Sequence, residues 1–124
     1  MVTPPARVLV VDDEAEIAGL VREILAQAGY EVATAASGAA ALERLGATPF
    51  DAIVSDLRMP DMDGAALWRE VSARHPELAA RILFVTGDTL SPDAREFLRS
   101  SDCAWLDKPF AKANLLARLA ALLA

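Results

Sequence analysis

The sequence predicts one α/β domain, built on a parallel β-sheet with helices on both faces. Short apolar runs alternate with longer amphipathic stretches five times along the 124 residues. Helices between successive strands imply right-handed crossovers, which produce parallel sheets that are buried on both faces. With 54% hydrophobic and only 6% aromatic residues, the composition excludes a disordered chain and favours a small sheet with closely packed helices. We expect residues 1–5 to form a disordered tail and residues 6–124 to form the domain.

The first strand and the first helix follow directly from the apolar pattern. Residues 8–11 form an uninterrupted β-branched and leucine run, which is typical of a strand buried on both faces. We expect Asp12 or Asp13 to cap a helix, because apolar residues then recur three and four positions apart across residues 17–28. Gly29 is expected to end this helix as a C-cap.

The next elements are shorter. Residues 30–35 form the second expected strand, and its weaker apolar content suits the edge of a sheet. A short helix then begins after Ser37, whose hydroxyl caps its first turn, and Gly46 is expected to end it. Residues 52–55 form the third strand, which is apolar until its last position.

The second half of the chain repeats the alternation. Residues 57–63 are rich in turn signals, and the helix after them ends before Pro76, because the residue before a proline disfavours helix. Residues 81–85 form the fourth strand. A fourth helix begins at Ser91, which is followed by a proline at the first helical position. A short strand at residues 104–106 and a leucine-rich last helix complete five strands and five helices.

Charge and cysteine content exclude several classes of partner and location. The formal net charge of −6 provides no field that would attract nucleic acid phosphates or anionic lipid. The single cysteine, Cys103, excludes an internal disulfide framework and fits a reducing cytoplasm. The amino terminus lacks the features of a signal peptide, and no apolar stretch is long enough to span a membrane. We therefore expect a cytoplasmic protein without nucleic acid or membrane partners.

Polar residues follow the strands where ligands bind in open α/β sheets, just beyond the carboxyl ends of the strands. These residues are Asp12, Asp13, Asp56, Thr86 and Lys108. Crowded carboxylates repel one another, and Mg²⁺, which prefers oxygen ligands, relieves that cost. A carboxylate nucleophile, a hydroxyl, a lysine and Mg²⁺ are the components that phosphoryl transfer requires. We expect Asp56, at the tip of the central strand, to be the nucleophile that forms an aspartyl phosphate.

Four motifs together resemble the receiver domains of two-component response regulators. They read RVLVVDDE at the start, SDLRMPDMDG around Asp56, FVTGD around Thr86 and LDKPF around Lys108. The motifs occur in the order and spacing of that family, and the similarity covers the chain from Arg7 to its end. The resemblance implies a flavodoxin-like sheet in strand order 2-1-3-4-5 with five helices.

The same resemblance implies roles for individual residues. Asp56 would accept a phosphoryl group from the phosphohistidine of a histidine kinase or phosphotransfer protein. Lys108 would pair with that group, and the peptide bond between Lys108 and Pro109 would be cis. The Mg²⁺ ligands would be Asp13, Asp56 and the main-chain carbonyl of Arg58, with Asp12 acting through a bound water.

The resemblance also implies a switch and a tuning pair. Thr86 and Trp105 would couple phosphorylation to a surface formed by the fourth helix, the fifth strand and the last helix, where a downstream protein binds. Trp105 stands where the family usually has tyrosine or phenylalanine, so a role in packing or partner contact is an equal alternative. Arg58 and Asp88 occupy positions that tune the loss of the phosphoryl group. We expect their opposite charges to pair across the mouth of the site and hinder attacking water, which predicts slow autodephosphorylation.

The first hypothesis is a signalling module controlled by its own phosphorylation, which is not an enzyme on other substrates. Two other functions compete with it. An aspartyl-phosphate hydrolase of the haloacid dehalogenase type needs a second aspartate two residues after the nucleophile, and Arg58 stands there. A receiver-like module that binds partners without phosphorylation remains an alternative, although no expected site residue is missing. The run FVTGDTLSPDAREFL resembles the receivers of hybrid histidine kinases more than receivers fused to DNA-binding domains, which favours a receiver excised from such a kinase. A single-domain regulator that acts by binding a partner is the alternative. The leucine stripe of the last helix suggests docking or a homodimer.

Overall fold

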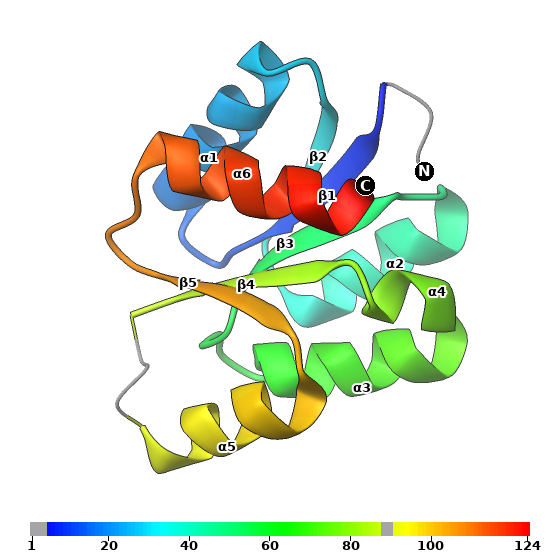
Figure 1. Ribbon diagram of the computed structural model, residues 1–124. Coiled ribbons are helices and arrows are strands. Elements are labelled where there is room, and N and C mark those ends of the chain that lie inside the picture. Colours follow the sequence, from blue (N-terminus) through cyan, green and yellow to red (C-terminus); the bar gives the residue numbers. More distant parts are fainter. Residues whose placement is uncertain (1–4, 88–90) are drawn as a thin grey trace.

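A five-stranded parallel sheet forms the centre of the computed structural model, which describes residues 5–87 and 91–124 (Figure 1). The strand order is β2-β1-β3-β4-β5, and each neighbouring pair is parallel. The strands are β1 (Arg7–Val11), β2 (Glu31–Ala35), β3 (Ala52–Asp56), β4 (Ile82–Thr86) and β5 (Ala104–Asp107). The predicted fold class and strand order are thereby confirmed.

Helices cover both faces of the sheet (Figure 1). They are α1 (Ala15–Gln27), α2 (Gly38–Ala47), α3 (Gly64–Arg74), α4 (Pro76–Ala79), α5 (Pro92–Ser101) and α6 (Lys112–Leu123). Helices α1 and α6 lie on one face, and α2, α3 and α5 lie on the other. The sheet is therefore enclosed between two layers of helices.

Two apolar cores hold these layers together, one on each face. Side chains alternate along a strand, so Leu9 of β1 enters the core beneath α2, α3 and α5, while Val8 and Val10 enter the core beneath α1 and α6. All three side chains are 2% exposed or less. Because β1, β3 and β4 are buried from both sides, their ends are held rigidly.

The predicted helix count of five is wrong, since the residues that the structure describes form six. The additional helix, α4, is a single turn that begins at Pro76, directly after α3 ends. The residue before proline ended α3 as expected, but the proline itself has a fixed φ that suits the first position of a new helix. Pro76 therefore both limits α3 and starts α4.

Helix ends were predicted with mixed success. The Ser37 and Ser91 hydroxyls accept hydrogen bonds from the first turns of α2 and α5, as expected. The expected cap of α1 is wrong: Glu14 occupies the N-cap position without a side-chain cap bond, and Asp12 Oδ1 instead accepts a hydrogen bond from the Glu14 N–H at 2.9 Å. Gly46 does not end α2, which continues to Ala47.

Within residues 5–87 and 91–124, no helix combines the length and apolar character needed to cross a bilayer. Most of the tail expected at residues 1–5 lies outside the described residues, so that expectation stays a prediction.

Candidate functional site

Three carboxylates gather at the carboxyl ends of β1 and β3, which are neighbours in the sheet. Oxygen atoms of Asp12, Asp13 and Asp56 all lie within 4.8 Å of one another. Asp12 and Asp56 are buried, at 5% and 8% exposure, whereas Asp13 is exposed. The Asp12 main chain continues the sheet, since its N–H donates to the Ala35 carbonyl oxygen at 3.1 Å. The backbone of two core strands therefore fixes where the carboxylates meet.

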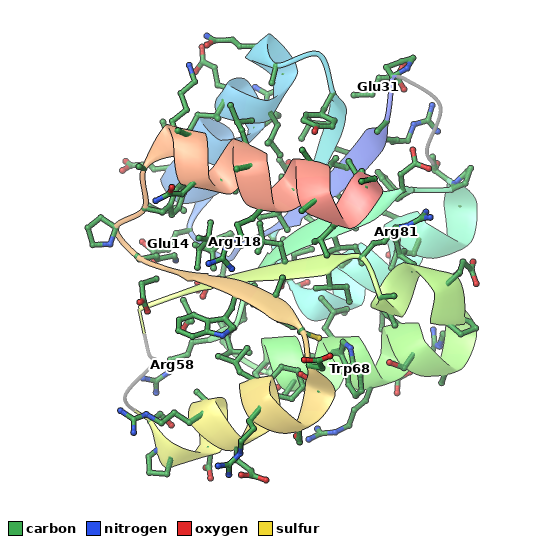
Figure 2. All side chains as sticks on the ribbon, viewed as in Figure 1. Glu14, Glu31, Arg58, Trp68, Arg81 and Arg118 are labelled. Carbon is green, nitrogen blue, oxygen red and sulfur yellow. The ribbon has the colours of Figure 1, made fainter. Side chains whose placement is uncertain are left out.

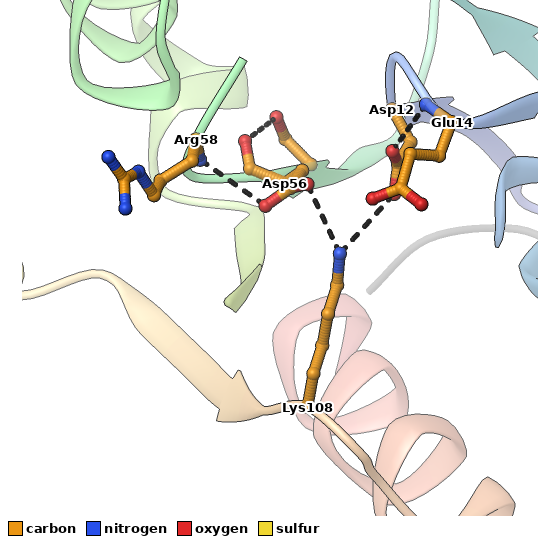
Figure 3. Close-up of polar contacts among 6 residues, drawn as sticks. Asp12, Glu14, Asp56, Arg58 and Lys108 are labelled. Carbon is orange, nitrogen blue, oxygen red and sulfur yellow. Dashed lines mark hydrogen bonds and ion pairs between the residues drawn. The ribbon is translucent and has the colours of Figure 1, made fainter. Parts of the chain in front are cut away.

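Lys108 directly follows β5, the edge strand, and its side chain reaches this cluster from there. Its Nζ lies 3.1 Å from Asp56 Oδ2 and 3.7 Å from Asp12 Oδ2 (Figure 3). The Lys108 N–H donates to the Thr86 carbonyl oxygen at 2.9 Å, which ties the lysine backbone to the end of β4. The peptide bond between Lys108 and Pro109 is cis. The lysine thus reaches between two carboxylates that belong to different strands.

The surroundings of Asp12 disfavour the charged form of its carboxyl group. Burial raises the pKa of Asp12; the Glu14 N–H and the charge of Lys108 oppose this rise, while the charges of Asp56 and Asp13 add to it. Burial lowers the pKa of Lys108, but its hydrogen bond to Asp56 and the nearby negative charges outweigh that effect, so the pKa of Lys108 is raised. One lysine therefore stays protonated among more carboxylates than it can neutralise.

The segment after β3, residues 57–63, forms the acceptor loop of the site. The Arg58 N–H donates to Asp56 Oδ1 at 3.2 Å, so the loop begins by bonding the carboxylate in front of it. The Gly64 N–H donates to the Leu57 carbonyl oxygen at 2.8 Å and brings the two ends of the loop together. Asp61, near the tip, has a φ of 66°, a left-handed conformation that aspartate tolerates better than most residues. The loop is a closed turn joined to Asp56.

Gly64 has a packing role that was not predicted from the sequence. A Cβ at Gly64 would lie 2.8 Å from the ring of Phe84 and 2.9 Å from both the Asp56 carbonyl oxygen and the Leu57 Cα. Glycine therefore permits α3 to start directly against the end of β3. The glycine that follows the aspartate-rich turn in the sequence was the available signal.

Thr86 and Trp105 occupy neighbouring strands but different environments. Thr86 ends β4 and is fully buried. Trp105 lies on β5, the edge strand, and is 36% exposed. Its carbonyl oxygen accepts a hydrogen bond of 3.1 Å from Nη1 of Arg118, a residue of α6 that lies beside β5 (Figure 2). Asp88 lies outside the described residues, so its pairing with Arg58 stays a prediction.

Comparison with known families decides the identity of this fold and site. The family described as the response regulator receiver domain matches residues 8–120. The chain belongs to this family. The match covers both core strands that carry the carboxylates, the acceptor loop and the lysine after β5. The structure is accordingly a flavodoxin-like receiver domain of the two-component type.

Relatives of this receiver domain differ in how much of their length it covers. The response regulator receiver protein CpdR of Brucella abortus is 36% identical over 107 residues, which span 84% of this chain and 85% of CpdR. The transcriptional regulatory protein ZraR of Escherichia coli is 37% identical over 112 residues, which span 90% of this chain. The chain spans about a quarter of the length of ZraR and of several other matching regulators.

Solved structures show the same fold. The chemotaxis protein CheY4 of Vibrio cholerae superposes with a TM-score of 0.85 at 38% sequence identity. The superposition covers 95% of this chain and 98% of CheY4. The likeness therefore extends over almost the whole of both chains.

The donor atoms of the receiver domain fit a hard divalent cation. Asp12, Asp13 and Asp56 offer three carboxylate oxygens in one small region, and Mg²⁺ prefers such oxygens. Their mutual repulsion, together with the raised pKa of Asp12, is the cost that a cation would remove. These residues are therefore a candidate Mg²⁺ site.

Proposed function

We propose that this receiver domain accepts a phosphoryl group on Asp56 from a phosphohistidine of a histidine kinase or phosphotransfer protein. The observation that supports this role is the placement of the buried Asp56 carboxylate against Lys108 and beside Asp12 and Asp13. A buried carboxylate that contacts an ammonium group and a cation site has the surroundings that phosphoryl transfer needs. The switch from unphosphorylated to phosphorylated Asp56 is the proposed signal.

The transfer exchanges one bond to phosphorus for another. A carboxylate oxygen of Asp56 forms a bond to phosphorus while the phosphorus–nitrogen bond of the donor breaks, and that electron pair returns to the imidazole nitrogen. Lys108, with Nζ 3.1 Å from Asp56 Oδ2, is placed to pair with oxygens of a phosphoryl group on that carboxylate. Thr86, at the end of the neighbouring strand, is the proposed hydroxyl donor to the same group.

Mg²⁺ is the proposed cofactor, and it would neutralise charge on the carboxylates and on the transferred group. Asp13 and Asp56 would bind it directly, together with the main-chain carbonyl of Arg58, and Asp12 would act through a water. The Arg58 N–H bond to Asp56 Oδ1 supports this set, since it holds the Arg58 main chain beside the acceptor carboxylate.

We propose that phosphorylation alters the surface formed by α5, β5 and α6, where a downstream protein would bind. Thr86 ends β4 at the site, and β4 pairs with β5 over the register that places Phe84 opposite Trp105. A change at Thr86 therefore has a direct backbone route to Trp105. The partial exposure of Trp105 supports a place on the contact surface.

The wider context of the receiver domain has two proposed forms. It acts either as a regulator that binds its target through this domain or as the receiver of a hybrid histidine kinase. A module that binds partners without phosphorylation is the remaining alternative. The experiment below separates that alternative from the two phosphorylated forms.

The test is phosphorylation by a small donor. The protein is incubated with Mg²⁺ and acetyl phosphate or phosphoramidate, and its intact mass is recorded beside that of Asp56→Asn. We expect a gain of one phosphoryl group that EDTA prevents and that the variant lacks. A protein that binds Mg²⁺ but gains no phosphoryl group from donors or from a kinase would be a binding module. A protein that does not bind Mg²⁺ would contradict the proposed site.

A further inference from the structure

Gly38, the first residue of α2, packs against the acceptor loop through Met62. A Cβ at Gly38 would lie 2.6 Å from the sulfur of Met62, 2.8 Å from its Cγ and 3.0 Å from its Cβ. Gly38 is buried, and among the glycines of the described residues only Gly29 has a positive φ. The contact with Met62, rather than an unusual backbone conformation, therefore explains why this position is glycine.

The added methyl group could not be accommodated by the far end of the methionine alone. Rotation about the side-chain bonds would move the sulfur and the Cγ of Met62, but its Cβ is fixed to the loop backbone. At 3.0 Å, that Cβ would still be closer than a normal carbon–carbon contact. A side chain at Gly38 would therefore displace the acceptor loop.

The acceptor loop transmits such a displacement to the carboxylate cluster. Its ends are joined by the bond between the Gly64 N–H and the Leu57 carbonyl oxygen, and the Met62 N–H donates to the Pro60 carbonyl oxygen at 2.8 Å. The loop is therefore a compact turn rather than a slack connection. Its other fixed point is the Arg58 N–H, which bonds Asp56 Oδ1. Movement at Met62 would change how the Arg58 main chain faces Asp56.

We infer that Gly38 and Met62 are positioning residues for the cation site, although α2 carries none of the proposed ligands. Their contact sets the position of the acceptor loop and, through it, the Arg58 main chain beside Asp56. The inference rests on the proposed function, in which the Arg58 carbonyl and Asp56 hold Mg²⁺. It assigns to the glycine at the start of α2 a role in Mg²⁺ affinity rather than in the chemistry of transfer.

The first test compares two glycine-to-alanine variants of the same helix. Gly38→Ala introduces the methyl group against Met62, whereas Gly46→Ala places it where nothing lies within 4 Å. Mg²⁺ affinity is measured by calorimetric titration without a phosphodonor. We expect Gly38→Ala to bind Mg²⁺ about tenfold more weakly, a typical loss when a supporting contact of a metal site is disturbed, and Gly46→Ala to match the wild type.

The rate of phosphorylation by acetyl phosphate provides the second readout. For Gly38→Ala, the Mg²⁺ concentration that gives half the maximal rate rises, while the rate at saturating Mg²⁺ approaches that of the wild type. A defect of equal size at all Mg²⁺ concentrations would instead indicate a general structural fault and would overturn the inference.

The third test is rescue by a second substitution. Met62→Ala removes the loop anchor without a clash, so it also weakens Mg²⁺ binding, and it carries the test if Gly38→Ala does not fold. In the double variant Gly38→Ala/Met62→Ala, the contacts with the Met62 sulfur and Cγ are gone, and only the 3.0 Å contact with the Cβ of residue 62 is left, so the loop is displaced less. The double variant should therefore bind Mg²⁺ more tightly than Gly38→Ala alone, because the two effects are coupled through one contact.

The outcomes separate this inference from the proposed function. Unchanged affinity in both Gly38→Ala and Met62→Ala, or a double variant no better than Gly38→Ala, would overturn the inference while leaving a phosphorylated wild type intact. A wild type that neither binds Mg²⁺ nor gains a phosphoryl group would remove the proposed function, and the inference with it.

Discussion

Replacement of Asp12 by asparagine should stabilise the metal-free protein while it weakens the response to Mg²⁺. Asparagine has the shape of aspartate, and its Oδ1 can still accept the 2.9 Å hydrogen bond from the Glu14 N–H. The substitution therefore removes one negative charge from the cluster and changes little else. Its effect on the free energy of unfolding reports the net cost of holding that charge in the folded protein.

The magnitude follows from the charges around Asp12. At an effective dielectric constant of about 20, repulsion between carboxylates at the 4.8 Å limit of this cluster is about 3.5 kcal/mol, and attraction to Lys108 at 3.7 Å is about 4.5 kcal/mol. Exposed Asp13 adds roughly 1 kcal/mol of repulsion in surroundings close to water. These terms nearly cancel, which leaves the cost of burial that raises the pKa of Asp12. We expect Asp12→Asn to raise the metal-free stability by about 1 kcal/mol, or about 4 °C in Tm.

Thermal unfolding in EDTA and at increasing Mg²⁺ concentrations measures both effects. Wild-type protein gains stability as Mg²⁺ binds the folded state, by about 2.7 kcal/mol at a concentration one hundred times Kd. Asp12→Asn should gain less, because it has lost one carboxylate of the cation site. The surface variant Glu23→Gln, which removes an exposed charge from α1, serves as the control and should stay within about 0.5 kcal/mol of the wild type.

The pH dependence provides a separate check on the same reasoning. Because the pKa of Asp12 is raised on folding, its carboxylate destabilises the folded protein most at pH values above that raised pKa. The cost disappears as the pH falls toward the ordinary carboxyl pKa of about 4. The stability difference between Asp12→Asn and the wild type should therefore shrink at acidic pH. A variant that is less stable than the wild type in EDTA at neutral pH would refute the argument.

Three further predictions concern the acceptor loop, the lysine and the lifetime of the phosphoryl group. Gly64→Ala should lower stability by about 1–3 kcal/mol in urea unfolding, because its Cβ meets backbone and a buried ring, whereas Gly19→Ala, with nothing within 4 Å, should not. Lys108→Met should lower the free energy of unfolding of the protein without Mg²⁺ at neutral pH, as measured by urea unfolding. Because the pKa of Lys108 is raised on folding, the difference in stability from the wild type should vanish as the pH rises through that raised pKa. Arg58→Ala and Asp88→Ala should each shorten the phosphoryl lifetime measured by intact mass, and unchanged lifetimes would contradict the predicted slow autodephosphorylation.

Much of the fold could be predicted because apolar runs in this chain mark the strands with little ambiguity. Residues 8–11 and 52–55 were predicted as buried strands, and they form the middle of the sheet as β1 and β3. From these two strands, the rule that parallel strands end at one edge was enough to bring Asp12 and Asp56 together. The gathering of the carboxylates thus depended on backbone topology, which the pattern of apolar residues determines.

Features that depend on contacts between distant side chains were not predictable in the same way. The contact of Gly38 with Met62 joins residues from different elements, and no periodicity in the sequence indicates it. The cap of α1 was misassigned because Asp12 bonds the Glu14 N–H within a turn before the helix begins. Local preference favours aspartate at a helix cap, but the Asp12 main chain continues β1, since its N–H bonds the Ala35 carbonyl oxygen, and α1 begins only at Ala15.

The charge balance of the cluster gives Lys108 two consecutive roles at one position. The ammonium group of Lys108 lies between the buried carboxylates of Asp12 and Asp56 and offsets part of the repulsion between them. A phosphoryl group on Asp56 would bring further negative charge close to Lys108, carried by the three non-bridging phosphoryl oxygens. Because Nζ lies 3.1 Å from Asp56 Oδ2, only a small movement is needed to pair with that group. In the proposed function, the same lysine would therefore prepare the site before transfer and stabilise its product, which is why its loss should affect both stability and phosphorylation.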